Sequence, residues 1–287
     1  MEDARLGLLT GLTGQVSESV RDWGVRDTFE RVLCKIAMKT LSRGFRKTDM
    51  PSFQTLCAAA QTVYDNPEQL LRGQFGVDEA EIALLRQEYD EHNAELSRRY
   101  ADRRLDYPRP WAFGSGSAFV LYALVRTMSP KTVLETGVAN GHSSFFILQA
   151  LSRNSSGGTL HSIDVSTNVG TLIEPAERAR WDLRLLSRSA PKKDFVSYLD
   201  AMPAIDLMIH DSDHTYRWMD FELETALSRL SASGLIVCDD TDLSFALIDF
   251  CERHSLKPVL LVDAPKVLGL LAPNGGTSAA GSAPTAS

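Results

Sequence analysis

Three aspartates follow two of the short apolar runs in the second half of the chain. Asp211 comes just after the run 205–209, and Asp239 and Asp240 come directly after the run 235–238. If the runs are neighbouring strands of a parallel sheet, about 4.8 Å apart, the carboxylates end at one edge and can converge on one ion. Such oxygens suit Mg²⁺ or a similar hard divalent cation. The sequence therefore predicts a metal site at Asp211, Asp239 and Asp240, where the metal would lower the pKa of a substrate hydroxyl group.

His214 lies three residues beyond Asp211, at the start of a predicted helix, where it could face the same cleft. A neutral imidazole can take the proton of a substrate hydroxyl at physiological pH. The alternative is that His214 caps the helix or bonds Asp211 as a structural partner. Strand alternation predicts that His210 points to the opposite side. Since Asp239 and Asp240 cannot both point inward from a regular strand, we expect one of them to cap the following helix.

A glycine-containing turn precedes these residues in the chain. Residues 133–144 read as a strand, a turn with Gly137 and Gly141, and the start of a helix. Glycines let the backbone come close to a ligand, and a helix start offers free N–H groups. The pattern G-x-G-x-x-G is not matched, which disfavours NAD as the ligand. An ordinary tight turn between a strand and a helix is the alternative.

Asp164 ends the next predicted strand, 23 residues after Gly141. A carboxylate at this place can accept hydrogen bonds from both hydroxyls of a ribose. The alternative is a turn cap, which is common for Asp after a strand. The turn and Asp164 together indicate a ligand that contains a nucleoside.

Apolar runs alternate with helical patterns after residue 130, which indicates an α/β fold with a parallel sheet covered on both faces. The predicted strands are residues 132–135, 159–164, 183–186, 205–209, 235–238 and 258–262. The predicted helices are residues 143–151, 192–199, 216–230 and 243–254. A final strand, 267–271, follows after only four residues, too few for a parallel crossover. We therefore expect the last two strands to form an antiparallel hairpin.

The first part of the chain has helical patterns and no convincing strand. We expect residues 1–105 to form a helical cap, with helices over 25–43 and 78–104. Arginines near the C-terminal end of the second helix suit its dipole, and we expect them on a solvated face. They are Arg98, Arg99, Arg103 and Arg104. Pro108 and Pro110 mark the boundary with a catalytic domain over 106–272. The Gly, Ser and Ala content of 273–287 predicts a disordered tail.

The composition narrows the possible functions. The 287 residues include 30 Lys and Arg against 37 Asp and Glu, a formal charge of −7 without a basic block. This balance disfavours a general nucleic-acid binder. No apolar run approaches about 18 residues, and the start lacks a secretory leader pattern, so a soluble, cytoplasmic protein without a membrane partner is expected. The four cysteines are scattered, which predicts reduced thiols rather than a disulfide or zinc framework.

Together these motifs resemble class I S-adenosylmethionine-dependent methyltransferases over residues 115–272. The pattern Asp211-x-x-His214-x-Tyr216 is similar to that of the small-molecule O-methyltransferase branch. The resemblance implies a Rossmann-like sheet of seven strands with an antiparallel last strand, and S-adenosyl-L-methionine as cofactor. The cofactor contacts that it implies are Glu135, Gly137, Gly141, Ser143, Asp164 and Ser189. It also supports His214 as the base and the three aspartates as ligands of Mg²⁺.

The leading interpretation is an enzyme that methylates a hydroxyl group of a small molecule, such as a sugar or a polyketide-type natural product, with help from a divalent metal. One alternative is a related enzyme that performs another reaction at the same cluster. Another is a non-catalytic nucleoside-binding or oligomerisation protein on a methyltransferase fold. Apolar faces on the first helices would permit a homo-oligomer. No motif names the methyl acceptor.

Overall fold

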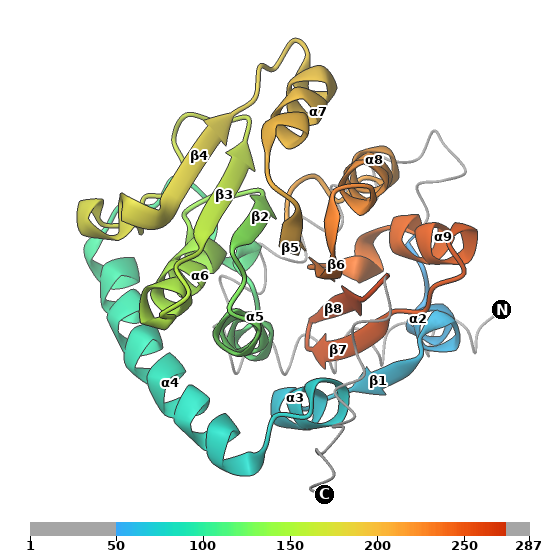
Figure 1. Ribbon diagram of the computed structural model, residues 1–287, viewed down its shortest axis with the longest axis horizontal. Helices are drawn as coiled ribbons and strands as arrows, with labels where there is room; N and C mark the ends of the chain where they lie inside the picture. The colour runs from blue at the N-terminus through green and yellow to red at the C-terminus, as the bar shows by residue number, and fades with distance from the viewer. Residues whose placement is uncertain (1–49, 274–287) are drawn as a thin grey trace, which may run out of the picture.

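Figure 1 shows the computed structural model, which describes residues 50–273. The helix expected over 25–43 and all but the first residue of the expected tail lie outside the described residues. The strands are β1 (Thr62–Tyr64), β2 (Thr132–Thr136), β3 (Thr159–Asp164), β4 (Trp181–Leu185), β5 (Ile205–His210), β6 (Leu230–Cys238), β7 (Val259–Asp263) and β8 (Lys266–Leu271). The α-helices are α2 (Phe53–Ala59), α3 (Pro67–Phe75), α4 (Glu79–Asp102), α5 (Ser115–Met128), α6 (His142–Arg153), α7 (Pro191–Ala201), α8 (Tyr216–Leu227) and α9 (Ala246–Arg253). Short 3₁₀ helices are η1 (Arg109–Trp111), η2 (Pro175–Arg180) and η3 (Thr241–Leu243).

The strands form one sheet in the order β1-β7-β8-β6-β5-β2-β3-β4. Within it, β8 runs antiparallel to both of its neighbours, β6 and β7, while the other neighbouring pairs are parallel. The α/β class and the antiparallel last strand are therefore confirmed. The sheet has eight strands instead of seven because β1 pairs in parallel with β7.

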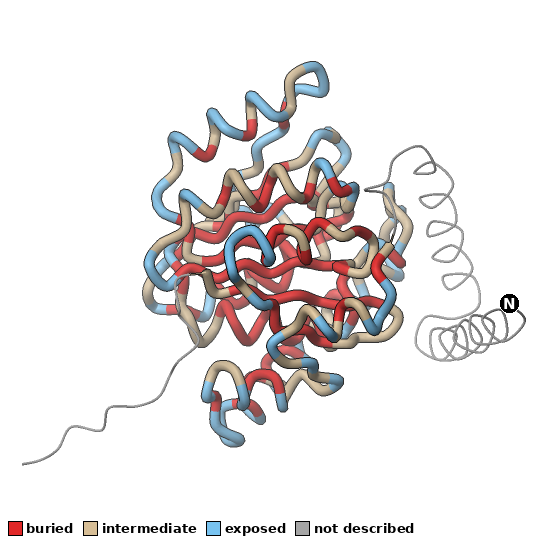
Figure 2. Tube along the Cα trace, turned by 90° about the vertical axis from the view of Figure 1, so that its right-hand side faces the viewer, coloured by how far each residue is buried: buried red, intermediate tan, exposed pale blue. Residues whose placement is uncertain are grey.

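Helices cover both faces of the sheet, so the central strands are buried on both sides and read as apolar runs. Buried side chains of α3 to α6 form one core against one face. Those of α7, α8 and α9 form a second core against the other face. Figure 2 shows the buried strands in the middle of the molecule, between helices whose outer sides are exposed. Of the helices between residues 50 and 273, none has the length and apolar character needed to cross a membrane.

Residues 50–105, the described part of the expected helical cap, are built into this core. The Asp78 carboxylate caps α4 by accepting from the Glu81 N–H at 2.8 Å. Tyr89 of α4 is buried, with its ring stacked on Phe146 at 4.7 Å between centroids. Its hydroxyl donates to the Ser115 carbonyl at 3.0 Å. Figure 1 shows α4 running along the outer side of α5 and α6 toward α3 and β1. The expectation of no strand in this segment is wrong, because three residues suffice for β1 once β7 offers an edge.

The arginines near the end of α4 fall into two groups. Arg98 is 72% exposed, as expected. The side chain of Arg99 is only 11% exposed, and it donates to the Leu172 carbonyl at 2.8 Å and to Glu177. Arg103 likewise donates hydrogen bonds to the Thr171 carbonyl and the Glu174 carboxylate in the loop 171–174. The expectation of a solvated face is therefore wrong for Arg99 and Arg103, because this loop and η2 pack against them.

Truncation of Tyr89 tests whether α4 belongs to the folded core. We expect Tyr89→Ala to lower the free energy of unfolding by about 3–5 kcal/mol, as for other buried aromatic side chains. Leu84→Ala on the same helix is the matched control, since Leu84 is 54% exposed; we expect a change within about 0.5 kcal/mol. Urea unfolding measures both, and equal effects would show that α4 does not contribute to the core.

Candidate functional site

The predicted site residues gather at one edge of the sheet. Here the parallel strands β2, β3, β5 and β6 have their carboxyl ends, which is where ligands bind in open α/β sheets. The strand β8 runs the opposite way, so its first residue, Lys266, arrives at this same edge. The antiparallel hairpin therefore brings a cation to the place where the acidic strand ends meet.

The turn after β2 requires its two predicted glycines. Gly137 has φ +83°, and a Cβ on it would lie 2.0 Å from the Asp211 carbonyl oxygen. Gly141 has φ +88° and begins α6 without a side-chain cap. Asn140 holds the turn against residue 107, since its side chain accepts from the Tyr107 N–H at 3.1 Å and donates to the Tyr107 carbonyl at 2.8 Å. The turn is thus fixed from several sides and directly touches the residue that follows β5.

Asp164 lies at the end of β3, beside this turn. One carboxylate oxygen accepts from the Val138 N–H at 2.9 Å. The other accepts from the N–H groups of Val165 and Ser166 at 2.7 and 2.9 Å. Asp164 therefore caps its own turn, as the alternative interpretation expected, and it also ties β3 to the glycine turn. It is half-buried, so its carboxylate still faces the edge of the sheet in part.

The carboxylate of Glu135 is fully buried behind the turn. It accepts hydrogen bonds from the hydroxyls of Ser143 and Ser144 at 2.7 Å and of Ser162 at 2.6 Å. Burial raises the pKa of Glu135, while the three hydroxyls oppose that rise. These bonds join β2, β3 and the first turn of α6, so Glu135 and Ser143 position the glycine turn from within.

Ser189 follows β4 and is exposed, with its hydroxyl 2.7 Å from that of Ser187. In the same loop, Arg188 donates to the Val165 carbonyl at 3.3 Å. The loop therefore lies next to the residues that follow Asp164. This placement leaves the adenine contact of Ser189 a prediction.

Two of the three predicted metal ligands, Asp239 and Asp240, contact the Lys266 side chain. The ammonium group is 2.9 Å from the Asp240 carboxylate and hydrogen-bonds the Asp239 carboxylate. Lys266 and Asp239 are 2% and 0% exposed. Asp240 adopts a left-handed conformation, φ +48° and ψ 41°, just after β6 has ended. The side chains of Asp239 and Asp240 therefore both contact Lys266. The expectation that one of them caps the following helix is wrong, since η3 has no side-chain cap bond.

Charge repulsion and burial shift the proton affinities of this cluster. The pKa of Asp211 is raised to about 8, mainly by burial and further by the charges of Asp240 and Glu135, while Lys266 opposes the rise. The pKa of Asp239 is raised to about 7 by burial and by Asp240 and Asp211, again against Lys266. A single ammonium group thus only partly balances the carboxylates around it.

His214 lies above the acidic cluster. Its Nε2 is 3.7 Å from the Asp211 carboxylate and 4.0 Å from that of Asp240. Its Nδ1 is buried and has no hydrogen-bond partner among the described residues. The N-cap of α8 is Thr215, so the interpretation of His214 as the helix cap is wrong. The imidazole is free to face a substrate from this position.

The sequence analysis missed a second buried carboxylate, Glu222, which contacts His214 indirectly through the His210 ring. Glu222 of α8 accepts from Thr136 at 2.7 Å and from Ser212 at 2.9 Å, and it lies 2.6 Å from Nδ1 of His210. The His210 ring meets the His214 ring edge to face, 5.3 Å between centroids. His210 therefore belongs to the Glu222 network, and its ring packs against His214 instead of lying apart from it. The sequence does contain a signal for this carboxylate, because Glu222 is an acidic residue on the otherwise apolar face of α8.

The described side chains do not fit the predicted metal. No group of three or more His, Cys, Asp or Glu side chains within residues 50–273 is arranged to hold an ion. The physical reason is Lys266, whose ammonium group holds the oxygens of Asp239 and Asp240 that a divalent cation would need.

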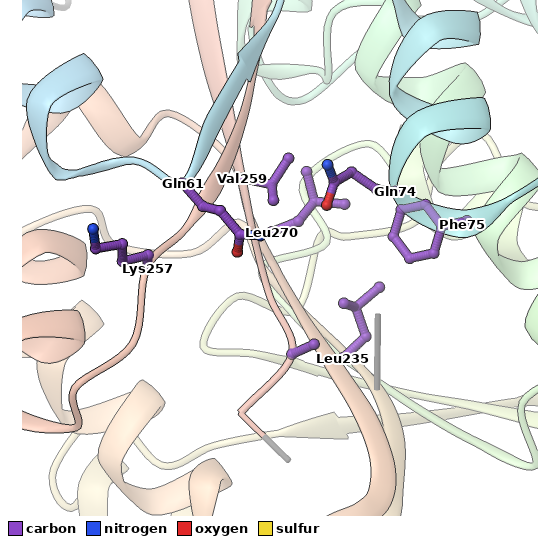
Figure 3. A pocket seen from close by; sticks show the side chains of 8 residues that line it. Gln61, Gln74, Phe75, Leu235, Lys257, Val259 and Leu270 are labelled. Carbon is purple, nitrogen blue, oxygen red and sulfur yellow. The ribbon is translucent and has the colours of Figure 1, made fainter. Parts of the chain in front are cut away.

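A hollow shown in Figure 3 lies away from this site, at the opposite ends of the strands. Its lining residues are Gln61, Gln74, Phe75, Leu235, Lys257, Val259, Leu270 and Ala272. Val259 begins β7 and Leu270 is near the end of β8, so the hollow faces the other edge of the sheet. It shares no residue with the acidic cluster.

Residues 134–241 match a family model described as a methyltransferase domain, the class that the motifs resemble. No curated protein matches the chain. A methyltransferase from Geobacter sulfurreducens is 16% identical over 71% of this chain and 93% of that one, with a TM-score of 0.46. An O-methyltransferase from Bacillus cereus, solved with SAH, is 14% identical over 71% and 96%, with a TM-score of 0.42. TomG from Streptomyces achromogenes, an O-methyltransferase involved in tomaymycin synthesis and solved with SAM, is 14% identical over 72% and 96%, with a TM-score of 0.45.

The contact between the glycine turn and Asp211 can be tested by adding one methyl group. Gly137→Ala and Gly157→Ala both place alanine at positive φ, +83° and +63°, which costs about 1–2 kcal/mol. At Gly157 the new Cβ would lie 3.4 Å from the end of the Arg180 side chain, whereas at Gly137 it would lie 2.0 Å from the backbone oxygen of Asp211. We expect Gly137→Ala to lower the free energy of unfolding by about 1–3 kcal/mol more than its control. Equal losses in chemical denaturation would contradict the close approach.

His142, the first residue of α6, predicts a pH dependence of stability. It is partly buried, with Nδ1 2.9 Å from the Tyr100 hydroxyl, and burial together with the charges of Arg109 and Lys266 lowers its pKa to about 3. In the unfolded chain the ring titrates near 6.5, so between about pH 6.5 and 3 only the unfolded state binds the proton. The contribution of His142 to the free energy of unfolding is thus fully present above pH 6.5. Below that pH it falls by up to about 1.4 kcal/mol per pH unit.

His142→Asn removes the titrating ring, so we expect a flatter pH dependence of the free energy of unfolding between pH 6.5 and 4.5. Tyr100→Phe is the control, because it removes the hydroxyl but keeps the imidazole, and its slope is expected to match that of the unmodified protein. Urea unfolding at several pH values measures the slopes. An unchanged slope in His142→Asn would show that folding does not lower the pKa of this ring.

Proposed function

We propose, from the premise that residues 134–241 form a methyltransferase domain, that the protein transfers the methyl group of S-adenosylmethionine to a hydroxyl group of a small molecule. The observation that carries this proposal is the contact between Gly137 and the Asp211 carbonyl. Because of it, a ligand held by the glycine turn lies beside the acidic cluster and His214. Cofactor binding and proton removal can then take place in one cleft.

The turn residues fit the proposed cofactor. Asp164 retains carboxylate oxygens at the sheet edge that can accept from ribose hydroxyls. Gly137 and Gly141 let the backbone approach, and the start of α6 offers N–H groups without a side-chain cap. Ser189 is the proposed adenine contact. S-adenosylmethionine held by Gly137, Gly141 and Asp164 would supply a methyl group on a positively charged sulfur for transfer to the acceptor oxygen.

His214 is the proposed general base. Its Nε2, which lies 3.7 Å from the Asp211 side chain, would take the proton of the acceptor hydroxyl. The His210 ring and Glu222 hold the histidine side of the cleft in place. Since the methyl donor is already charged, positioning of the hydroxyl supplies much of the catalysis. The small-molecule acceptor is supported by the net charge of −7, which disfavours a nucleic acid.

A pair of variants separates cofactor binding from catalysis. We expect S-adenosylhomocysteine to bind the purified protein in a calorimetric titration. NAD is the control ligand, and we expect it not to bind. Asp164→Ala is expected to weaken this affinity at least about tenfold, since hydrogen bonds from ligand hydroxyls to a charged group are lost. His214→Gln is expected to leave the affinity within about twofold and to lower turnover about 10²–10⁴-fold.

Turnover is measured as release of S-adenosylhomocysteine during a screen of hydroxylated metabolites. Binding of S-adenosylhomocysteine without turnover of any hydroxylated compound would favour a non-catalytic nucleoside-binding protein. Absence of binding would contradict the proposed function as a whole. Equal loss of binding in both variants would contradict the division of roles between Asp164 and His214.

A further inference from the structure

The Lys266 ammonium group lies where the sequence predicted a divalent cation. We propose that Lys266 permanently replaces that cation, so that the acidic cluster of Asp211, Asp239 and Asp240 is closed by an internal positive charge and works without a metal ion. This inference rests on the proposed function for its role in catalysis, but the occupancy of the cluster can be measured independently.

The backbone that carries Lys266 is fixed. Lys266 pairs with Asp263 across the hairpin between β7 and β8. The Asp263 carboxylate in turn accepts from the Ser117 N–H of α5 at 2.7 Å, and a Cβ on Gly114 would overlap it. The side chain of Lys266 is 2% exposed. Leaving the cluster would therefore take a buried ammonium group away from its carboxylates and into a packed interior, which is unfavourable.

The charge of Lys266 also disfavours a second cation at these carboxylates, even though Oδ1 of Asp239 has no hydrogen-bond partner among the described residues. Asp239 is completely buried, and one of its oxygens is bonded to the ammonium group. Asp240 points at the same group from the other side, at 2.9 Å. A divalent ion that bound these oxygens would lie within a few ångströms of the ammonium charge and would be repelled by it.

The consequence for the reaction is a division of roles. A bound divalent metal would lower the pKa of the acceptor hydroxyl directly. A single ammonium group that is already bonded to two carboxylates supplies much less of that effect, so proton removal falls to His214. Lys266 then acts as a positioning residue, because its ammonium group holds the Asp240 carboxylate in one place. That carboxylate lies 4.0 Å from Nε2 of His214.

Binding of Mn²⁺ alone, followed by electron paramagnetic resonance and calorimetry on the full chain, tests the proposal. We expect no Mn²⁺ binding that depends on Asp211 in the unmodified protein. Lys266→Ala leaves three carboxylates and room between them, so we expect it to gain Mn²⁺ affinity by at least about tenfold, and Asp211→Asn in that background to remove the gain. Lys266→Arg keeps the charge and is expected to gain nothing. Lys257→Ala, at the far edge of the sheet, is the matched lysine control.

Two outcomes would overturn the proposal. One is Mn²⁺ binding to the unmodified protein that Asp211→Asn abolishes. The other is a folded Lys266→Ala protein, as judged by circular dichroism and its unfolding midpoint, that gains no Mn²⁺ affinity. If Lys266→Ala does not fold, Lys266→Met keeps the length of the stem, and the measurement on the unmodified protein still decides. Failure of S-adenosylhomocysteine to bind would instead contradict the proposed function, whatever the Mn²⁺ result.

Discussion

A carboxylate that is removed from water loses several kcal/mol of hydration free energy unless protein groups replace that water. This protein buries three of them beside one edge of its sheet, and each is balanced differently. Three serine hydroxyls surround Glu135, while a histidine, a threonine and a serine meet Glu222. Asp239 is met by the Lys266 ammonium group. Because the partners come from different strands and helices, balancing these charges also fixes the relative positions of β2, β3, α6 and α8.

Much of the arrangement could be predicted from the sequence, because strands buried on both faces appear as apolar runs and parallel strands end at a common edge. That rule places Asp211, Asp239 and Asp240 at one edge from the sequence alone, and it places Asp164 beside the glycine turn. It also gave the reversal of the last strand, since four residues cannot form a parallel crossover. These inferences need only local patterns and the direction of the chain.

The remainder depends on contacts between segments that are distant in the sequence, which leave little trace in local patterns. The strand β1 exists because β7 offers an edge, and Arg99 is covered because a loop more than seventy residues away packs on it. The left-handed backbone of Asp240 let both neighbouring aspartates face inward, which no strand pattern predicts. Lys266 was within reach of inference, since the first residue of a reversed strand must lie at the carboxyl edge. Its partners, however, appear only in three dimensions.

The pairing of β1 with β7 also bears on how the chain can fold. These two strands lie near the two ends of the described residues, yet they are hydrogen-bonded neighbours at one side of the sheet. During synthesis β1 leaves the ribosome early and has no partner until nearly all the remaining strands have been made. Its pairing closes a very long loop, which is entropically costly and slow. We therefore expect the docking of β1 onto β7 to be the last step in assembling the described sheet, and this pairing then joins segments from near both ends of residues 50–273.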